Sequence, residues 1–156
     1  MVTFPALRAR ALSGSEFQLP QQLPAHTTVV IAAFRQWHQS MVDEWIAALV
    51  HHGIPATPRG LSDPATAVIE IPVLKRRWSA ARGVIDGGMA SGIADADVNA
   101  RTWTAYTDVA AFLGAFGETD ESALLVAVVD RAGDVAALVR GPLTEESLQV
   151  VLRALG

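Results

Sequence analysis

The sequence of 156 residues contains no cysteine. This absence excludes disulfide bonds, thiolate metal sites and every reaction that needs a thiol nucleophile from this chain. It does not indicate a cellular compartment, because a chain without cysteine is compatible with oxidising and with reducing surroundings.

Clusters of basic residues are also scarce. The formal net charge is −4, and the only basic run is Lys75-Arg76-Arg77. A nucleic-acid-binding protein would need a broader basic face, whereas a run of three basic residues is more typical of a solvated helix start. Nucleic acid is therefore not expected as a partner.

Long apolar runs are missing as well. None approaches the roughly 18 residues that a membrane-spanning helix needs, and no apolar segment follows a basic one near the N-terminus, as in a signal peptide. With 51% hydrophobic and 18% charged residues, the composition is that of a globular protein. We expect one cytoplasmic domain over residues 1–156, not inserted in a membrane, with residues 1–11 as a loosely ordered N-terminal arm.

The most informative stretch joins a strand, a turn and a helix. Residues 28–34 are continuously apolar and rich in β-branched side chains, which indicates a strand buried on both faces. Residues 35–40 predict a short exposed turn. Apolar residues then recur at helical spacing from Val42 to Val50, with Ser40 as the expected N-cap and Asp43 in the first turn.

Apolar runs and apolar residues at helical spacing also indicate the other strands and helices. Predicted strands cover residues 17–19, 67–72, 102–107, 123–129 and 135–140, and the second ends at Pro72 because proline cannot donate to a ladder. Predicted helices cover residues 78–89, 95–101, 109–116 and 144–155. Asp108 caps the third of these helices, and Gly133 allows a hairpin turn between the last two strands. The fold class is therefore α/β.

Two segments resemble the thioredoxin-like redoxins, which include the peroxiredoxin (AhpC/TSA) and thioredoxin families. Residues 124–141 contain an apolar strand, an Asp-x-x-Gly turn and a return strand ahead of a helix, as in the C-terminal half of those proteins. Phe34-Arg35-Gln36-Trp37-His38-Gln39-Ser40-Met41 lies where they have an aromatic strand end, a Trp and a Cys-x-x-Cys. The resemblance implies a thioredoxin-like fold, with a central mixed sheet flanked by helices and an N-terminal strand or hairpin extension.

The departures from these families bear on function. When the pattern is aligned on Trp37, the two family cysteines fall on His38 and Met41. The families also have a cis-proline ahead of the strand that faces the cysteines, where this chain has Asp120-Glu121-Ser122. Thiol peroxidase and disulfide oxidoreductase activities are therefore excluded by composition.

A second resemblance is to the thioredoxin-like assembly chaperones of mitochondrial ATP synthase, which lack a reactive cysteine pair. It is carried by Arg35-Gln36-Trp37, Glu70-Ile71, Trp78 and the segment from Trp103 to Tyr106. It implies a domain that contacts other proteins, without implying the mitochondrial role.

Seven residues are candidates for binding a ligand or partner: Arg35, Trp37, His38, Gln39, Met41, Glu70 and Arg101. Trp37 is the strongest, because a tryptophan in an exposed polar turn is typical of a binding anchor. The equal alternative is a buried tryptophan that serves as a lid.

Glu70 and His38 each allow two interpretations. Glu70 interrupts an apolar strand and should face away from Ile69 and Ile71. It is either a site carboxylate near the Trp37 turn, or a residue that forms a salt bridge with Arg76, Arg77 or Arg101 or is simply exposed. His38 and Met41 could offer a nitrogen and a thioether to a soft metal, but two ligands are too few. The simpler interpretation makes His38 an exposed turn residue and Met41 core filler, so neither a metal nor a cofactor is predicted.

The preferred hypothesis is a cysteine-less thioredoxin-like domain that binds a protein or peptide, with Trp37, His38 and Gln39 at the contact surface. The alternative is a small-ligand carrier or a cysteine-independent enzyme with a polar pocket of Arg35, His38, Glu70 and Arg101. No catalytic residue is assigned, the partner is unknown, and a homodimer is left open.

Overall fold

The computed structural model describes residues 2–56, 63–76, 85, 89 and 96–156. Its strands are β1 (Leu7–Ala11), β2 (Glu16–Leu19), β3 (Thr27–Ala33), β4 (Thr66–Lys75), β5 (Trp103–Thr107), β6 (Leu125–Asp130) and β7 (Val135–Arg140). Its helices are the 3₁₀ turn η1 (Gln36–His38), α1 (Gln39–His51), α3 (Ala96–Arg101), α4 (Val109–Gly114) and α5 (Glu145–Leu155).

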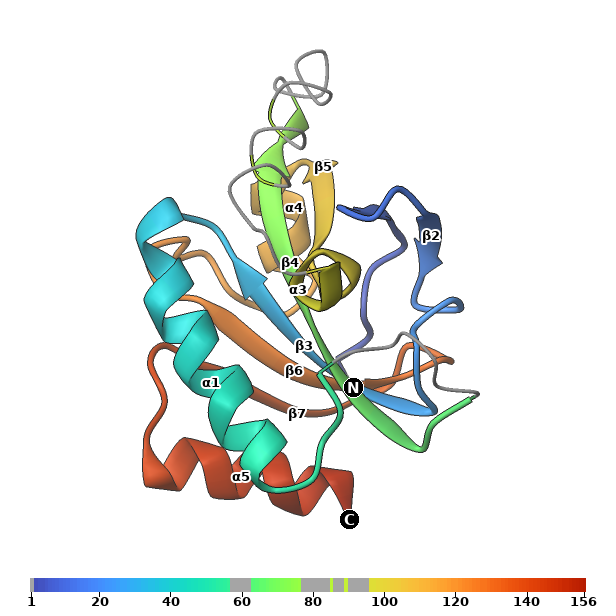
Figure 1. The fold of residues 1–156 in the computed structure, drawn as a ribbon. Helices are drawn as coiled ribbons and strands as arrows, with labels where there is room; N and C mark the ends of the chain where they lie inside the picture. Colours follow the sequence, from blue (N-terminus) through green and yellow to red (C-terminus); the bar gives the residue numbers. More distant parts are fainter. Residues whose placement is uncertain (1, 57–62, 77–84, 86–88, 90–95) are drawn as a thin grey trace.

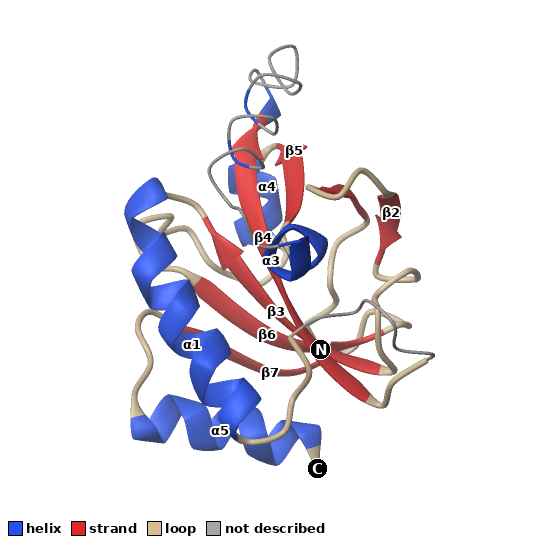
Figure 2. Cartoon of the chain, in the orientation of Figure 1, coloured by secondary structure: helices blue, strands red, loops and turns tan. Residues whose placement is uncertain are grey.

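The strands form one seven-stranded sheet in the order β2-β1-β5-β4-β3-β6-β7. The central pairs β3–β4 and β4–β5 are parallel, while the outer pairs are antiparallel. Helices α1 and α5 cover one face of the sheet, and α4 packs on the other (Figures 1 and 2). The predicted α/β fold with a mixed sheet flanked by helices is confirmed.

The core is divided by the sheet into two layers, because successive side chains of a strand point to opposite faces. On β3, Val30 packs towards α4, while Val29 and Ile31 pack towards α1 and α5. All three side chains are fully buried. The prediction that this strand is buried on both faces is therefore confirmed.

The N-terminal segment differs from the expectation of a loose arm. Residues 7–11 form β1, which pairs with β2 on one side and with β5 on the other. Leu7, Ala9 and Ala11 are buried, whereas Arg8 is exposed and Arg10 half-buried. This alternation is a strand pattern that the interpretation of the sequence overlooked. The expected edge strand around Phe17 and Leu19 is confirmed as β2.

The predicted end of a strand at Pro72 is wrong. Strand β4 continues to Lys75, and Pro72 lies in register with Ala33, the last residue of β3. The continuous pairing of β4 with β5 begins at Val73. Glu70 already bridges Thr102 in the same register, so Pro72 lies in a break of the β4–β5 ladder, between this bridge and Val73.

The start of α1 also differs from the prediction. Because η1 precedes it, the helix begins at Gln39, with His38 as its N-cap, and Ser40 lies inside the helix. Val50, expected on the apolar stripe, is 49% exposed. The caps Asp108 and Thr144 are in place, since their side chains accept hydrogen bonds from the backbone N–H groups of Ala111 and Ser147.

The helix expected over residues 78–89 lies outside the described residues, apart from Ile85 and Met89. In the parts of the chain that the structure describes, no helix is long and apolar enough to cross a membrane.

Candidate functional site

The turn between β3 and α1 carries two adjacent aromatic rings with opposite exposures. The side chain of Trp37 is 60% exposed, whereas that of His38 is fully buried. The interpretation of His38 as an exposed turn residue is therefore wrong, and its side chain does not lie at the surface. Met41 is half-buried against the core beneath α1, which agrees with its interpretation as core filler.

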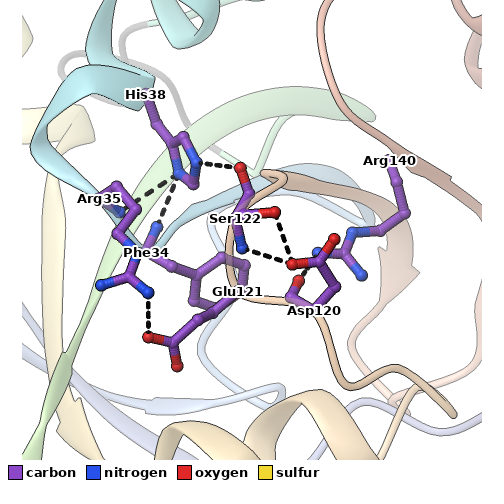
Figure 3. Close-up of polar contacts among 7 residues, drawn as sticks. All are labelled: Phe34, Arg35, His38, Asp120, Glu121, Ser122 and Arg140. Carbon is purple, nitrogen blue, oxygen red and sulfur yellow. Dashed lines mark hydrogen bonds and ion pairs between the residues drawn. The ribbon is translucent and has the colours of Figure 1, made fainter.

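Both ring nitrogens of His38 have hydrogen-bond partners (Figure 3). Nδ1 lies 3.0 Å from the backbone nitrogen of Phe34 and 3.3 Å from that of Arg35. Nε2 lies 3.0 Å from the carbonyl oxygen of Ser122. Because Nδ1 faces two N–H donors and Nε2 faces an acceptor, the ring is the tautomer with its proton on Nε2.

Two aromatic rings hold the imidazole from its sides. The ring centroid of Trp37 lies 4.4 Å from the imidazole centroid, with 74° between the two planes. The centroid of the Phe34 ring lies 6.4 Å away, with 86° between the planes. Phe34 in turn packs against Phe112 of α4. The imidazole therefore links the exposed indole of Trp37 to the core.

The loop that precedes β6 is tied to the same turn. Arg35 forms an ion pair with Glu121 at 2.6 Å, and His38 donates to the backbone of Ser122 (Figure 3). Asp120 accepts hydrogen bonds from the hydroxyl and the backbone N–H of Ser122, and these bonds lower the pKa of its carboxyl. This loop is the Asp120-Glu121-Ser122 segment at which the redoxin families have a cis-proline.

Arg140, at the end of β7, fixes the loop from its other side (Figure 3). Its Nε donates to the carbonyl of Leu124 at 3.1 Å, and its Nη2 donates to the carbonyls of Asp120 and Ala123. Its Nη1 pairs with Glu118 at 3.1 Å. The loop is therefore held by the turn on one side and by the sheet on the other.

Glu70 belongs to a separate hydrogen-bond network on the α1 side of the sheet. It is 2% exposed, and it faces away from Ile69 and Ile71, as predicted. Its Oε2 lies 3.4 Å from Nε2 of Gln39, and its Oε1 contacts the hydroxyl of Thr102. Burial raises the pKa of this carboxyl above its ordinary value.

Arg101 acts on Glu70 at longer range. Its guanidinium lowers the pKa of Glu70, although the two groups form no ion pair in the described part of the chain. The predicted salt bridges of Glu70 with Arg76 and Arg101 are thus not seen among the described residues, and Arg77 lies outside them.

Four of the seven candidate residues divide between two networks. Arg35 and His38 contact the loop before β6, whereas Gln39 contacts Glu70, which in turn contacts Thr102. The contacts of the described residues therefore do not assemble the single polar pocket that the alternative hypothesis needs. They also contain no group of three His, Asp or Glu side chains that could hold a metal ion.

Sequence reasoning did not single out several participants, among them Arg140, Ser122 and Thr102. Ser122 could have been found, since the alignment with the redoxins already places its loop opposite the helix start. Thr102 offers no such signal, because its bridge to Glu70 joins residues 32 positions apart in the sequence.

Comparisons with known proteins give no match among protein-family models and none among curated proteins. Among solved structures, one from Aquifex aeolicus VF5, described as a candidate electron transfer protein, is similar to this chain. It is 15% identical with a TM-score of 0.63, over 99% of this chain and 94% of that one.

Two further structures share the fold. BsSco, of the Sco family of cytochrome c oxidase assembly proteins, is 9% identical with a TM-score of 0.61, over 99% of this chain and 94% of its own. A secreted thiol-disulfide isomerase from Corynebacterium glutamicum is 19% identical with a TM-score of 0.57, over 97% of this chain and 84% of its own.

At these identities the likeness shows the fold alone. The resemblance to ATP synthase assembly chaperones has no support among these structures, and the cytoplasmic location stays a prediction, since one structural neighbour is secreted. The chain has a thioredoxin-like fold in which no cysteine is present.

Proposed function

We propose that this chain is a redox-inactive thioredoxin-like module that binds a protein or peptide through the turn between β3 and α1. The observation that carries the proposal is the 60% exposure of Trp37 on a turn whose next residue, His38, is fully buried. An exposed indole is a typical interface anchor, because it offers a large apolar area together with an N–H donor.

The turn is held in place before any partner binds. His38 joins it to Ser122, and Arg35 joins it to Glu121. Binding normally costs free energy because side chains and loops must be ordered. Where the anchor is already ordered, more of the contact energy appears as affinity.

The contact surface consists of exposed residues of the turn and of the start of α1. Arg35, Gln36, Trp37, Gln39 and Ser40 are exposed. His38 supports Trp37 from beneath. The composition excludes thiol chemistry at this position, so contact is the role that the remaining side chains can perform.

Affinity capture with paired variants tests the proposal. The wild-type chain, Trp37→Ala and Val50→Ala are immobilised and exposed to a lysate of the source organism, and the bound proteins are quantified by mass spectrometry. Val50 is the matched control, because it is a large apolar residue of α1 that is 49% exposed. We expect a partner that the wild type and Val50→Ala retain and Trp37→Ala loses. Equal capture by all three chains would contradict the proposal.

A further inference from the structure

Glu70 is a buried carboxyl group that the proposed contact surface does not use. It lies on β4 in the interior of the sheet and is 2% exposed. Its partners come from two other elements: Gln39 from α1, and Thr102 from the junction of α3 and β5. Helix α3 lies directly over β4 (Figure 1). The hydrogen-bond donors and acceptors in these contacts indicate whether the carboxyl carries a proton.

The orientation of the Gln39 amide is fixed by Asp43. Nε2 of Gln39 lies 3.0 Å from Oδ1 of Asp43 and 3.4 Å from Oε2 of Glu70. The carboxylate of the exposed Asp43 can only accept, so the amide nitrogen must face it, and its two hydrogens serve both oxygens. Oε2 of Glu70 is therefore an acceptor.

The hydroxyl of Thr102 has a single proton and two oxygen neighbours. Its Oγ1 lies 2.7 Å from the carbonyl oxygen of Val98 and also contacts Oε1 of Glu70. The carbonyl of Val98 can only accept, so the hydroxyl proton belongs to that bond. The contact between Oγ1 and Oε1 then needs a proton from Glu70.

We propose that Glu70 is a neutral carboxylic acid whose Oε1–H donates to Thr102, and that the relay from Glu70 through Thr102 to the carbonyl of Val98 is a pH-sensitive clamp between β4 and α3. The carbonyl oxygen Oε2 accepts from Gln39, which joins α1 to the same group. The clamp exists whether or not Trp37 binds a partner.

Ionisation of Glu70 opens the clamp. A carboxylate can only accept, so Thr102 would have to turn its proton towards Glu70 and give up its hydrogen bond to the carbonyl of Val98. Burial raises the pKa of Glu70 above its ordinary value, hydrogen bonds with Thr102 and Gln39 and the charge of Arg101 lower it, and Asp43 from α1 raises it. The clamp is therefore closed at low pH and opens as the pH rises through the raised pKa.

An NMR titration of the Glu70 side-chain carboxyl distinguishes the two directions of the Thr102 bond. Thr102→Val removes the acceptor of the carboxylic acid, so the pKa of Glu70 should fall. If Thr102 instead donates to a carboxylate, the same substitution raises this pKa. Thr28→Val is the matched control, because Thr28 is a buried threonine of β3 whose hydroxyl has no hydrogen-bond partner among the described residues. An unchanged or raised pKa in Thr102→Val would overturn the proposal.

Glu70→Gln gives a second test, which stands even where Thr102→Val does not fold. A glutamine amide can donate to Thr102 and accept from Gln39, so it reproduces every bond of the neutral acid. At a pH below the pKa that the wild-type titration gives for Glu70, the expected urea midpoint is at least that of the wild type, with a weaker dependence on pH. A carboxylate that accepts both bonds cannot be replaced in this way, so a lowered midpoint at that pH would overturn the proposal.

Discussion

His38 donates a hydrogen bond from Nε2 to the carbonyl oxygen of Ser122 over 3.0 Å, although the two residues lie 84 positions apart in the sequence. The bond joins the start of α1 to the loop before β6, the two segments at which the redoxin families have their reactive cysteines and their cis-proline. In this chain a buried imidazole fills the space between them. The hydrogen bond is a structural joint between the two segments, beneath an exposed tryptophan.

The joint should matter for stability. His38→Ala removes the acceptor of the Phe34 and Arg35 N–H groups and leaves a cavity beside Phe34. We expect a loss of about 2–4 kcal/mol in the free energy of unfolding, measured by urea denaturation. His51→Ala is the control, since His51 is exposed near the end of α1. Equal stability of the two variants would show that His38 does not hold the turn.

The tautomer of His38 can be read directly. Its Nδ1 accepts two backbone hydrogen bonds, so the proton should lie on Nε2. The nitrogen chemical shifts of the imidazole, measured by NMR on labelled protein, should show a protonated Nε2 and an unprotonated Nδ1. A proton on Nδ1 would contradict the hydrogen-bond pattern of the turn.

The sequence predicted the parts of the fold that depend on local signals. The cap Asp108 and the turn at Gly133 are specified by residues within a few positions of one another, and the structure confirms them. The burial of His38 depends on Ser122, and the continuation of β4 beyond Pro72 depends on its pairing with β3 and β5. Those partners are distant in the sequence, so no local pattern could indicate them.

In the candidate site, too, local sequence patterns predicted some features and could not predict those that depend on distant residues. The polar neighbours of Trp37 left an exposed anchor and a buried lid as equal alternatives, and the structure has the indole exposed. The orientation of Glu70 followed from the alternation of a strand. The expected pocket did not form among the described contacts, because His38 and Glu70 point towards different partners. The expected place of a residue in the fold does not fix which element its side chain faces.

The hydrogen bonds of Asp120 in the loop before β6 should make the stability of the folded state depend on pH. Hydrogen bonds from Ser122 lower the pKa of Asp120 below its ordinary value of 3.8. A lowered pKa stabilises the folded state above the pKa of the unfolded chain, and this stability is lost as the pH falls through the folded-state value. Ser122→Ala should raise the pKa of Asp120 towards 3.8 in an NMR titration. Ser40→Ala, an exposed serine of α1, should leave it unchanged. A pKa that Ser122→Ala does not move would refute the assignment.

A buried hydroxyl offers a stabilising substitution. Oγ1 of Thr28 is buried without a hydrogen-bond partner among the described residues. Leaving such a group unpaired costs roughly 1–3 kcal/mol, and valine has nearly the same shape. Thr28→Val should raise the urea midpoint. Once the cost of any change in packing is subtracted, the free energy of unfolding should rise by up to about 1 kcal/mol. A clear loss of stability would mean that the hydroxyl has a partner in solution.

Trp37 should contribute to binding and not to folding. Because its side chain is 60% exposed, Trp37→Ala should change the free energy of unfolding by no more than about 0.5 kcal/mol. Thermal and urea unfolding of the variant beside the wild type check this. A loss of stability similar to that of His38→Ala would assign the indole to the core.

The most direct test is a calorimetric titration of the captured partner into the wild type, Trp37→Ala and Val50→Ala. A tryptophan at the centre of an interface contributes about 2 kcal/mol or more, so Trp37→Ala should bind roughly 30-fold more weakly. Val50→Ala should bind as the wild type does. Unchanged affinity in Trp37→Ala would contradict the account of this turn as a contact surface.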